Sequence, residues 1–285
     1  MEKIKVAVIG GSGLSRIEKG QGKILRPKTP FGYPSGPIAI QEAAWGRWAF
    51  LPRHGDGHVV LPSEVNQRAN LFALKSLGVE RVVSFTAVGS LKEELAPGAF
   101  LFPDQLVDET KGRPSTFFGE GVVAHAAFAD PFCDPQSRIL FEAARELKIA
   151  ARRGGSYVCI EGPHFSTRAE SERYRAWGCS VIGMTASPEA KLAREAEICY
   201  SQACMVTDYD CWKKGQEVST SQVVERMKLN VRNARRLMEV VLPLIAARRR
   251  DCPCVRALEG AFMTDPEKAD ARTRRKLSLL IAGRL

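Results

Sequence analysis

Two aspartates, Asp208 and Asp210, stand two residues apart in the stretch Thr207-Asp208-Tyr209-Asp210-Cys211-Trp212, directly after an apolar run over residues 198–206. The apolar run predicts a buried strand, and residues two apart at the end of a strand point to the same side. Because buried carboxylates are costly without a polar partner, the pair indicates a ligand. A metal ion, a sugar nucleotide held through a metal, and the nitrogen edge of a heterocycle all fit. A solvated loop with two acids is the remaining interpretation.

Small, hydroxyl and basic residues follow three other predicted strands. Gly10-Gly11-Ser12-Gly13 ends the first strand, Arg53-His54 follows a hairpin, and Thr86-Ala87-Val88-Gly89-Ser90 follows the strand over 81–85. Glycine turns offer backbone N–H groups to an anion, and an arginine can bind an oxyanion through two parallel hydrogen bonds. Strand ends in α/β proteins meet at one edge, so these residues predict a phosphate site. A tight turn at 10–13 and a polar surface loop after 53 stay open as alternatives.

Strands and helices alternate along the chain, and they would position these residues. Strands are expected over 4–10, 36–41, 47–51, 81–85, 99–107, 156–160, 179–183 and 198–206. Helices are expected from Ser63 to Leu77, from Asp134, from Thr167 to Trp177 with a capping box between Thr167 and Glu170, from Ser187 to Ile198, over 221–249 and after Asp265-Pro266. Such alternation predicts an α/β fold with a sheet covered on both faces. One domain over 1–285, with a C-terminal helical tail over 251–285, is the expected organisation.

Composition excludes several classes of protein. The 285 residues are 45% hydrophobic, and the formal net charge is +10. No apolar run approaches the ~20 residues that a membrane span needs, and the N-terminus predicts a strand instead of a signal peptide. We therefore expect a cytoplasmic protein without a membrane partner. The basic residues are dispersed, and the clusters at 248–250 and 272–276 lack interleaved aromatic residues, which argues against nucleic-acid binding.

Eight cysteines stand at positions 133, 159, 179, 199, 204, 211, 252 and 254. They form no paired CxxC pattern, which argues against a zinc ribbon, and no metal is expected. Cys252-Pro253-Cys254 is an unusual pair. The sequence leaves open whether these cysteines are buried thiols or form disulfides.

Over residues 4–250 the chain resembles the 5′-methylthioadenosine phosphorylases, which belong to the trimeric purine nucleoside phosphorylase group. The motifs that carry the resemblance occur in the family's order: Gly10-Gly11-Ser12-Gly13, Thr29-Pro30-Phe31-Gly32, Arg53-His54-Gly55, Thr86-Ala87-Val88-Gly89-Ser90, Glu161-Gly162-Pro163, Met184-Thr185 and Thr207 to Trp212. The resemblance implies a three-layer sandwich, with a central mixed β-sheet flanked by helices. Two features depart from the family: His164 replaces the arginine of its EGPRF motif, and the segment from Lys213 to Val218 is one residue short.

The resemblance implies phosphorolysis of 5′-methylthioadenosine to adenine and 5-methylthioribose 1-phosphate, a reaction of purine and methionine salvage. Phosphate would be a co-substrate, no cofactor would be needed, and the protein would be a homotrimer or a dimer of trimers. By motif match, phosphate would be bound by Ser12, Arg53, His54, Thr86, Ala87 and Thr185. The purine and ribose would contact Phe165, Ser166, Met184, Asp208 and Asp210. The 5′-substituent would contact His58, Thr220, Val223 and Val224, together with His125 from a neighbouring subunit.

The cleavage of the C1′–N9 glycosidic bond explains why two aspartates suit this reaction. Negative charge builds on the purine as the C1′–N9 bond breaks, so an acid at N7 accelerates the reaction. We expect Asp208 to be that acid, its pKa raised by desolvation and by Asp210. Asp210 would stay ionised and accept a hydrogen bond from the 6-amino group.

The sequence leaves four alternative functions open. A phosphorylase of the same fold could act on 5′-methylthioinosine or on purine nucleosides in general, and a hydrolase could use water instead of phosphate. A DxD glycosyltransferase or phosphatase would need a divalent metal, and a non-enzymatic nucleic-acid binder would show salt-dependent binding to duplexes.

Overall fold

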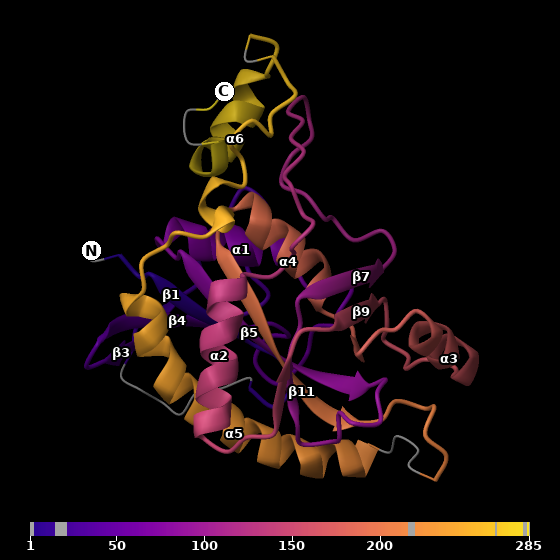
Figure 1. Ribbon diagram of the computed structural model, residues 1–285. Coiled ribbons are helices and arrows are strands. Elements are labelled where there is room, and N and C mark those ends of the chain that lie inside the picture. Colours follow the sequence, from indigo (N-terminus) through magenta and orange to yellow (C-terminus); the bar gives the residue numbers. More distant parts are fainter. Residues whose placement is uncertain (1–2, 15–21, 216–219, 266, 282–283, 285) are drawn as a thin grey trace.

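The computed structural model describes residues 3–14, 22–215, 220–265, 267–281 and 284 (Figure 1). The strands are β1 (Val6–Gly10), β2 (Ile24–Leu25), β3 (Ile38–Ala43), β4 (Gly46–Pro52), β5 (Arg81–Ser90), β6 (Phe100–Phe102), β7 (Gln105–Glu109), β8 (Ala151–Arg153), β9 (Ser156–Ile160), β10 (Val181–Gly183) and β11 (Cys199–Asp208). The helices are α1 (Gln67–Ser76), α2 (Asp134–Glu146), α3 (Arg168–Ala176), α4 (Ala186–Glu195), α5 (Thr220–Ala247) and α6 (Ala271–Ile281), with a short 3₁₀ helix, η1 (Pro253–Arg256).

One mixed sheet joins all of these strands. Its main path runs β2-β3-β4-β1-β5-β10-β9-β7, and β11 pairs with both β5 and β6. The central pairs β1–β4, β1–β5 and β5–β11 are parallel, whereas β5–β10, β6–β11 and β3–β4 are antiparallel. The mixed sheet implied by the sequence is confirmed.

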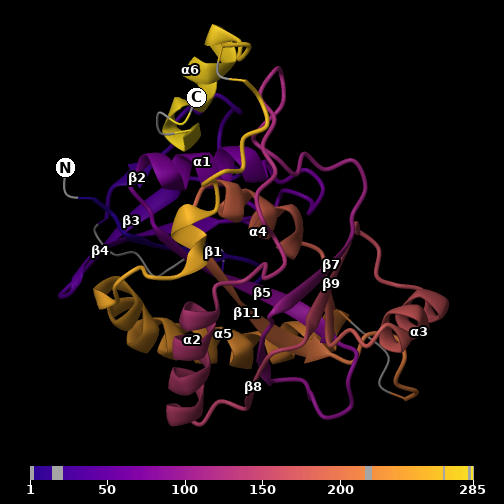
Figure 2. The same ribbon diagram turned by 45° about the horizontal axis from the view of Figure 1, so that its top comes forward.

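Helices cover both faces of this sheet, as Figures 1 and 2 show from two directions. Along β1, Val6 and Val8 pack into a cluster with α2 and α5, and Ala7 and Ile9 pack into a cluster with α1 and α4. Alternate residues of a strand point to opposite faces, so a strand covered on both faces must be apolar throughout. The predicted α/β sandwich is therefore confirmed.

Several predicted element boundaries are wrong. The strand expected over 81–85 continues to Ser90 as β5, so Thr86 to Ser90 lie within the strand and do not follow it. The first helix was expected to begin at Ser63, but α1 begins at Gln67, because the Asn66 side chain accepts a hydrogen bond from the Ala69 N–H and caps it. The predicted strand over 99–107 is two strands: β6 pairs with β11 and β8, while β7 pairs with β9. The capping box between Thr167 and Glu170 is present as predicted.

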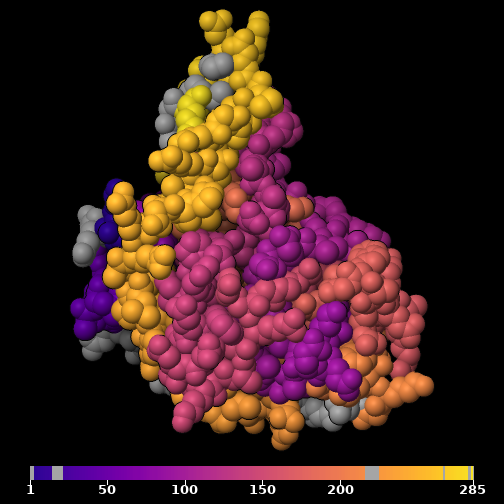
Figure 3. Space-filling view, viewed as in Figure 1, coloured from indigo at the N-terminus to yellow at the C-terminus, as the bar shows by residue number. Residues whose placement is uncertain are grey.

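The C-terminal tail packs against the loop over 117–128. The Met263 N–H donates to Val123 O at 2.9 Å, and the His125 N–H donates to Ala261 O at 2.8 Å. Leu258 and Leu277 of the tail belong to the same apolar cluster as Phe117, Phe118 and Val122. Loop and tail project side by side from the body of the molecule (Figure 3), and we call this projection, residues 117–128 with 257–265 and 267–281, the arm.

Among the described residues, no helix combines the length and the apolar character that crossing a membrane requires.

Candidate active site

A cavity of about 320 Å³ opens where β1, β10 and β11 end, beside the second half of β5. Most of the predicted site residues line it: Ser12, His54, His58, Thr86, Ala87, Phe165, Ser166, Met184, Thr185, Asp208 and Asp210. The residues predicted for phosphate and those predicted for the purine therefore share one cavity, although they come from segments far apart in the sequence. We call the two sides of this cavity the phosphate end and the purine end.

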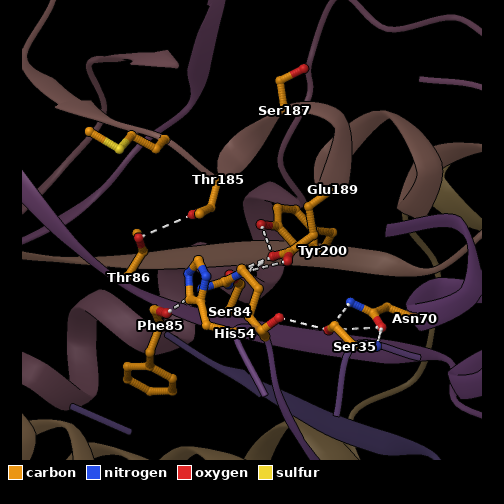
Figure 4. A network of polar contacts seen from close by, with 12 residues as sticks. Ser35, His54, Asn70, Ser84, Phe85, Thr86, Thr185, Ser187, Glu189 and Tyr200 are labelled. Atoms are coloured by element: carbon orange, nitrogen blue, oxygen red, sulfur yellow. Dashed lines mark hydrogen bonds and ion pairs between the residues drawn. The ribbon is translucent and has the colours of Figure 1, made fainter. Parts of the chain in front are cut away.

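At the phosphate end, two hydroxyl groups and an imidazole meet. Thr86 Oγ1 and Thr185 Oγ1 lie 3.2 Å apart (Figure 4), and His54 Nδ1 lies 2.9 Å from Val60 O. Because a carbonyl oxygen only accepts, His54 Nδ1 carries the proton, and Nε2 of the neutral ring is left as an acceptor. Burial, with the nearby charge of Arg53, lowers the pKa of His54 to about 4. His54 is therefore uncharged at neutral pH.

The Arg53 side chain lies behind the phosphate end and is fully buried. Its Nε and Nη2 donate to the two carboxylate oxygens of Glu189 at 2.7 and 3.0 Å, and Nη2 also donates to Ser84 Oγ. The buried carboxylate that binds it holds the pKa of Arg53 above its usual value although desolvation opposes this. Figure 4 shows Ser84 and Tyr200 pointing at Glu189, and both donate hydrogen bonds to it.

Arg53 itself does not line the cavity, and its Nη1 group lies beside the turn after β1. Nη1 donates to Phe85 O at 3.2 Å, and a Cβ atom added to Gly11 would lie 2.7 Å from Nη1. The Nη1 group thus lies against the turn that carries Ser12. Direct binding of phosphate by Arg53 stays a prediction, because most of its donors are already used by Glu189, Ser84 and Phe85.

At the purine end, Asp208 and Asp210 are held close together. The Asp210 N–H donates to Asp208 Oδ1 at 2.8 Å, and Thr207 Oγ1 lies 2.7 Å from Asp208 Oδ2 and 3.2 Å from Val88 O. This turn requires a φ of +52° at Asp210, a left-handed conformation that aspartate tolerates better than most residues. A Cβ on Gly89 would lie 3.0 Å from Asp208 Oδ1, so the missing side chain makes room for the carboxyl group.

Burial raises the pKa values of both carboxyl groups. For Asp208, desolvation dominates, and the hydrogen bonds from Thr207 and the Asp210 backbone oppose it. For Asp210, desolvation is again largest, the Ser171 hydroxyl opposes it, and the charge of Asp208 adds to the rise. The predicted rise at Asp208 is present, but its cause is burial alone and not the charge of Asp210. The pKa of Asp210, which was expected to stay ionised, is raised as well.

The outer wall of the purine end is open. Phe165 is 67% exposed, and the buried Ser166 Oγ has no hydrogen-bond partner among the described residues. A buried hydroxyl without a partner is costly, and it points to a ligand that would complete it. Met184 and Ile182 also line the cavity and supply apolar surface.

The sequence did not identify Arg113, which ties the loops of the purine end together. Its guanidinium donates to both Glu161 carboxylate oxygens at 3.1 Å, to Glu161 O at 2.6 Å and to Met184 O at 2.7 Å. It thus fixes the loop after β9 to the loop after β10. Arg113 lies in a polar loop without a recognisable pattern, so no local signal could have found it. Leu61, Pro62 and Met227 also line the cavity and were not identified: Leu61 and Pro62 lie in a loop, and Met227 lies on α5 in an apolar stripe typical of core packing.

The residues predicted for the 5′-substituent have different outcomes. His58 lines the cavity, and its ring lies 4.4 Å from that of His54. Thr220, Val223 and Val224 lie on the first turns of α5, but their side chains are outside the described residues, as are residues 216–219. His125 is exposed on the arm and does not line the cavity of its own chain.

Comparison with known proteins gives consistent matches. A model of the phosphorylase superfamily matches residues 5–246. The chain is 49% identical over 286 residues to the S-methyl-5′-thioadenosine phosphorylase of Geobacter sulfurreducens, with 99% of each chain covered.

Solved structures agree with this. The methylthioadenosine phosphorylase from an antarctic soil metagenomic library has a TM-score of 0.92 and 44% identity, and the match covers 98% of this chain and 99% of that one. A mutant adenosine/methylthioadenosine phosphorylase from Schistosoma mansoni, solved in complex with methylthioadenosine, has a TM-score of 0.83 and 36% identity, with 90% of this chain and 96% of that one covered.

Proposed function

The chain belongs to the phosphorylase superfamily, and on that basis we propose that it cleaves 5′-methylthioadenosine with inorganic phosphate, giving adenine and 5-methylthioribose 1-phosphate. The observation that carries the proposal is that the hydroxyl and imidazole groups of the phosphate end line the same cavity as Asp208 and Asp210. Relatives that bear the name of this activity, over nearly the whole chain, support the same substrate.

Phosphate would be bound by Ser12, Thr86 and Thr185, with the backbone N–H of Ala87. Because His54 is neutral, its free Nε2 can accept a hydrogen bond from a protonated phosphate oxygen, so no extra positive charge lies beside the cationic sugar. Arg53, paired with Glu189, holds the turn beneath the phosphate in place. Preorganised donors of this kind stabilise the transition state without reorganising during the reaction.

Asp208 would protonate N7 of the departing purine. Its raised pKa favours the protonated form that an acid needs. Thr207 suits both protonation states, because its hydroxyl can donate to an ionised Asp208, or accept from a protonated one while donating to Val88 O. The Asp208 proton can therefore leave and return without breaking the surrounding contacts.

Asp210 would accept a hydrogen bond from the purine 6-amino group, and Ser166 and Phe165 would contact the base and ribose. Since the pKa values of both aspartates are raised, we propose that the pair holds one proton in the complex, on Asp208, and that the amino group stabilises the ionised Asp210. A 6-oxo purine would place an oxygen against this carboxylate and would be rejected.

The 5′-methylthio group would lie toward His58, Leu61, Pro62 and Met227, whose surfaces are mainly apolar. Thr220, Val223 and Val224 belong to the same proposed pocket. His125 would complete it from a neighbouring subunit of a homotrimer, which its exposed place on the arm allows. We further propose that residues 1–285 form one domain in a cytoplasmic enzyme that needs no cofactor.

The test is an assay of adenine release from 5′-methylthioadenosine, with and without phosphate. We expect release only with phosphate, together with 5-methylthioribose 1-phosphate, and little hypoxanthine from 5′-methylthioinosine. Equal rates without phosphate would identify a hydrolase instead. Comparable rates with 5′-methylthioinosine or inosine would identify a phosphorylase of broader specificity.

A further inference from the structure

Four cysteines from three distant segments meet in the interior. Cys133 precedes α2, Cys199 begins β11, and Cys252 and Cys254 stand at the start of the tail. Their sulfur atoms all lie within 4.8 Å of one another, and all four residues are buried. Cys252 Sγ is 3.3 Å from Cys199 Sγ and 3.8 Å from Cys133 Sγ.

These distances fit a metal centre. Four thiolates around a tetrahedral zinc ion, with Zn–S bonds of about 2.3 Å, are about 3.8 Å apart. The four sulfurs here are gathered around one point, and Cys252 is close to two different partners instead of one. Two disulfides would instead require each sulfur to have a single partner at about 2 Å.

The surroundings suit such a centre. Cys133 is the N-cap residue of α2 but makes no capping hydrogen bond with its side chain, so its sulfur is free of that role. The positive end of a helix stabilises a thiolate at this position. A cavity of about 310 Å³ adjoins Cys133, Cys252 and Cys254, and Arg153 and Arg194 also line it. It gives an ion access to the site, and Asp104, Asp130 and Asp134 line it together with the two arginines.

We propose that Cys133, Cys199, Cys252 and Cys254 bind one structural zinc ion. On binding, the four thiols release four protons to the solvent, and the centre carries a net charge of −2. The absence of a paired CxxC pattern led us to expect no metal. The proposal departs from that expectation because the ligands lie up to 121 residues apart in the chain, from Cys133 to Cys254, and only the fold brings them together.

The position of the centre indicates its role. It joins the start of the tail to the ends of α2 and β11, and the tail continues into the arm that carries His125. Zinc would thus fix the base of the arm to the sheet. Structural zinc sites contribute directly to folding, so loss of the ion should loosen the tail before it affects the sheet.

The experiment measures metal in the full chain, purified without chelators, by plasma mass spectrometry and by thiol titration. We expect about one zinc per chain, released to a chromogenic chelator when a mercurial titrates the thiols. Cobalt(II) added to the metal-free protein should give the intense visible bands of tetrahedral thiolate coordination. Cys252→Ser and Cys254→Ser should abolish stoichiometric zinc binding, whereas Cys179→Ser, a buried cysteine outside the cluster, should retain it.

Other outcomes would overturn the proposal. Metal-free protein in which only four of the eight cysteines titrate under denaturing, non-reducing conditions would identify two disulfides. Eight free thiols with no uptake of zinc or cobalt would identify plain buried cysteines, and iron at this position would exclude zinc as the ion. Should the serine variants fail to fold, the titration of the unmodified chain still decides. None of these readouts depends on catalytic activity, so the metal centre and the proposed function can fail separately.

Discussion

The two ends of the cavity are built differently. Behind the phosphate end, the Arg53 charge is matched by Glu189, which also accepts hydrogen bonds from Ser84 and Tyr200, all without exposure to solvent. At the purine end, the half-buried Asp208 and the buried Asp210 have no cation beside them among the described residues, and Phe165 is largely exposed.

This difference indicates that the residues behind the phosphate end stabilise the fold, whereas those of the purine end serve the reaction. A buried pair whose hydrogen bonds are satisfied contributes rigidity, because removing either partner leaves an uncompensated charge. Buried carboxyl groups without a cation store unfavourable energy that a ligand can relieve, and strained sites of this kind are typical of catalytic centres. We therefore expect substitutions at the two ends to affect different quantities.

The largest effect is expected from Asp208→Asn. Without an acid at N7, kcat with 5′-methylthioadenosine should fall about 10²–10⁴-fold, while the thermal stability at neutral pH should not decrease. Steady-state kinetics and thermal unfolding measure the two quantities. Glu146→Gln, which removes an exposed carboxylate from α2, is the control and should keep full activity. Near-normal turnover in Asp208→Asn would exclude Asp208 as the acid.

Glu189→Gln should reduce stability instead. It leaves the Arg53 guanidinium buried without a counter-charge, at a cost of about 3–5 kcal/mol in the free energy of unfolding. Urea denaturation measures this. Glu94→Gln breaks the exposed pair with Arg152 and should cost less than about 1 kcal/mol. Equal losses in the two variants would contradict the structural role of the buried pair.

The pH dependence of stability should have opposite signs at the two ends of the cavity. At the phosphate end, His54 is the group responsible. Its pKa is lowered from 6.5 to about 4, so between these values the unfolded chain binds a proton that the folded chain excludes. Stability is then lost as the pH falls through this window, by about 2–4 kcal/mol at most. His54→Asn should flatten this part of the profile in phosphate-free urea titrations; an unchanged slope would show that His54 is not the group responsible.

Asp208 should act in the other direction. Because burial raises its pKa above 3.8, the folded state holds a proton that the unfolded state has released, and stability falls as the pH rises above 3.8. Asp208→Asn should remove this fall, so its curve should lie above that of the unmodified protein at neutral pH. The assignment would be contradicted if Asp208→Asn and the unmodified protein lost the same amount of stability between pH 4 and neutral pH.

Asp210→Ala should give the smallest effect, on substrate choice. Loss of the acceptor for the 6-amino group should reduce the preference for 5′-methylthioadenosine over 5′-methylthioinosine about 10–100-fold, the equivalent of 1–3 kcal/mol. The ratio of kcat/KM for the two substrates measures it. If the ratio stays constant, another group recognises the 6-position.

Local patterns predicted much of the fold and the cavity. The apolar run before Asp208, the glycine turn before Ser12 and the capping box at Thr167 are each encoded by neighbouring residues, and the structure has all three features. A resemblance over residues 4–250 was needed to assign Thr185 and Ser166, whose local sequence carries no distinctive signal.

What the sequence could not predict depends on distant contacts. Arg53 pairs with Glu189, which is 136 positions away in the chain. The local pattern indicated an arginine that binds an anion, but it could not show that the Glu189 carboxylate already accepts hydrogen bonds from its guanidinium. Arg113 and the four-cysteine cluster were missed for the same reason. In each case the partners are brought together by the order of strands in the sheet, which local periodicity does not encode.

The path of β5 has one more consequence. Thr86, at the proposed phosphate, and Gly89, paired in register with Asp208, lie three residues apart on this single strand, a span of about 10 Å. The gap between the nucleophile and the acid is therefore set by the length of a stretch of extended backbone, which cannot adapt to a longer or shorter reactant. Tolerance toward different nucleosides would have to evolve at the proposed 5′ side, where Leu61 and Pro62 line the cavity from a loop.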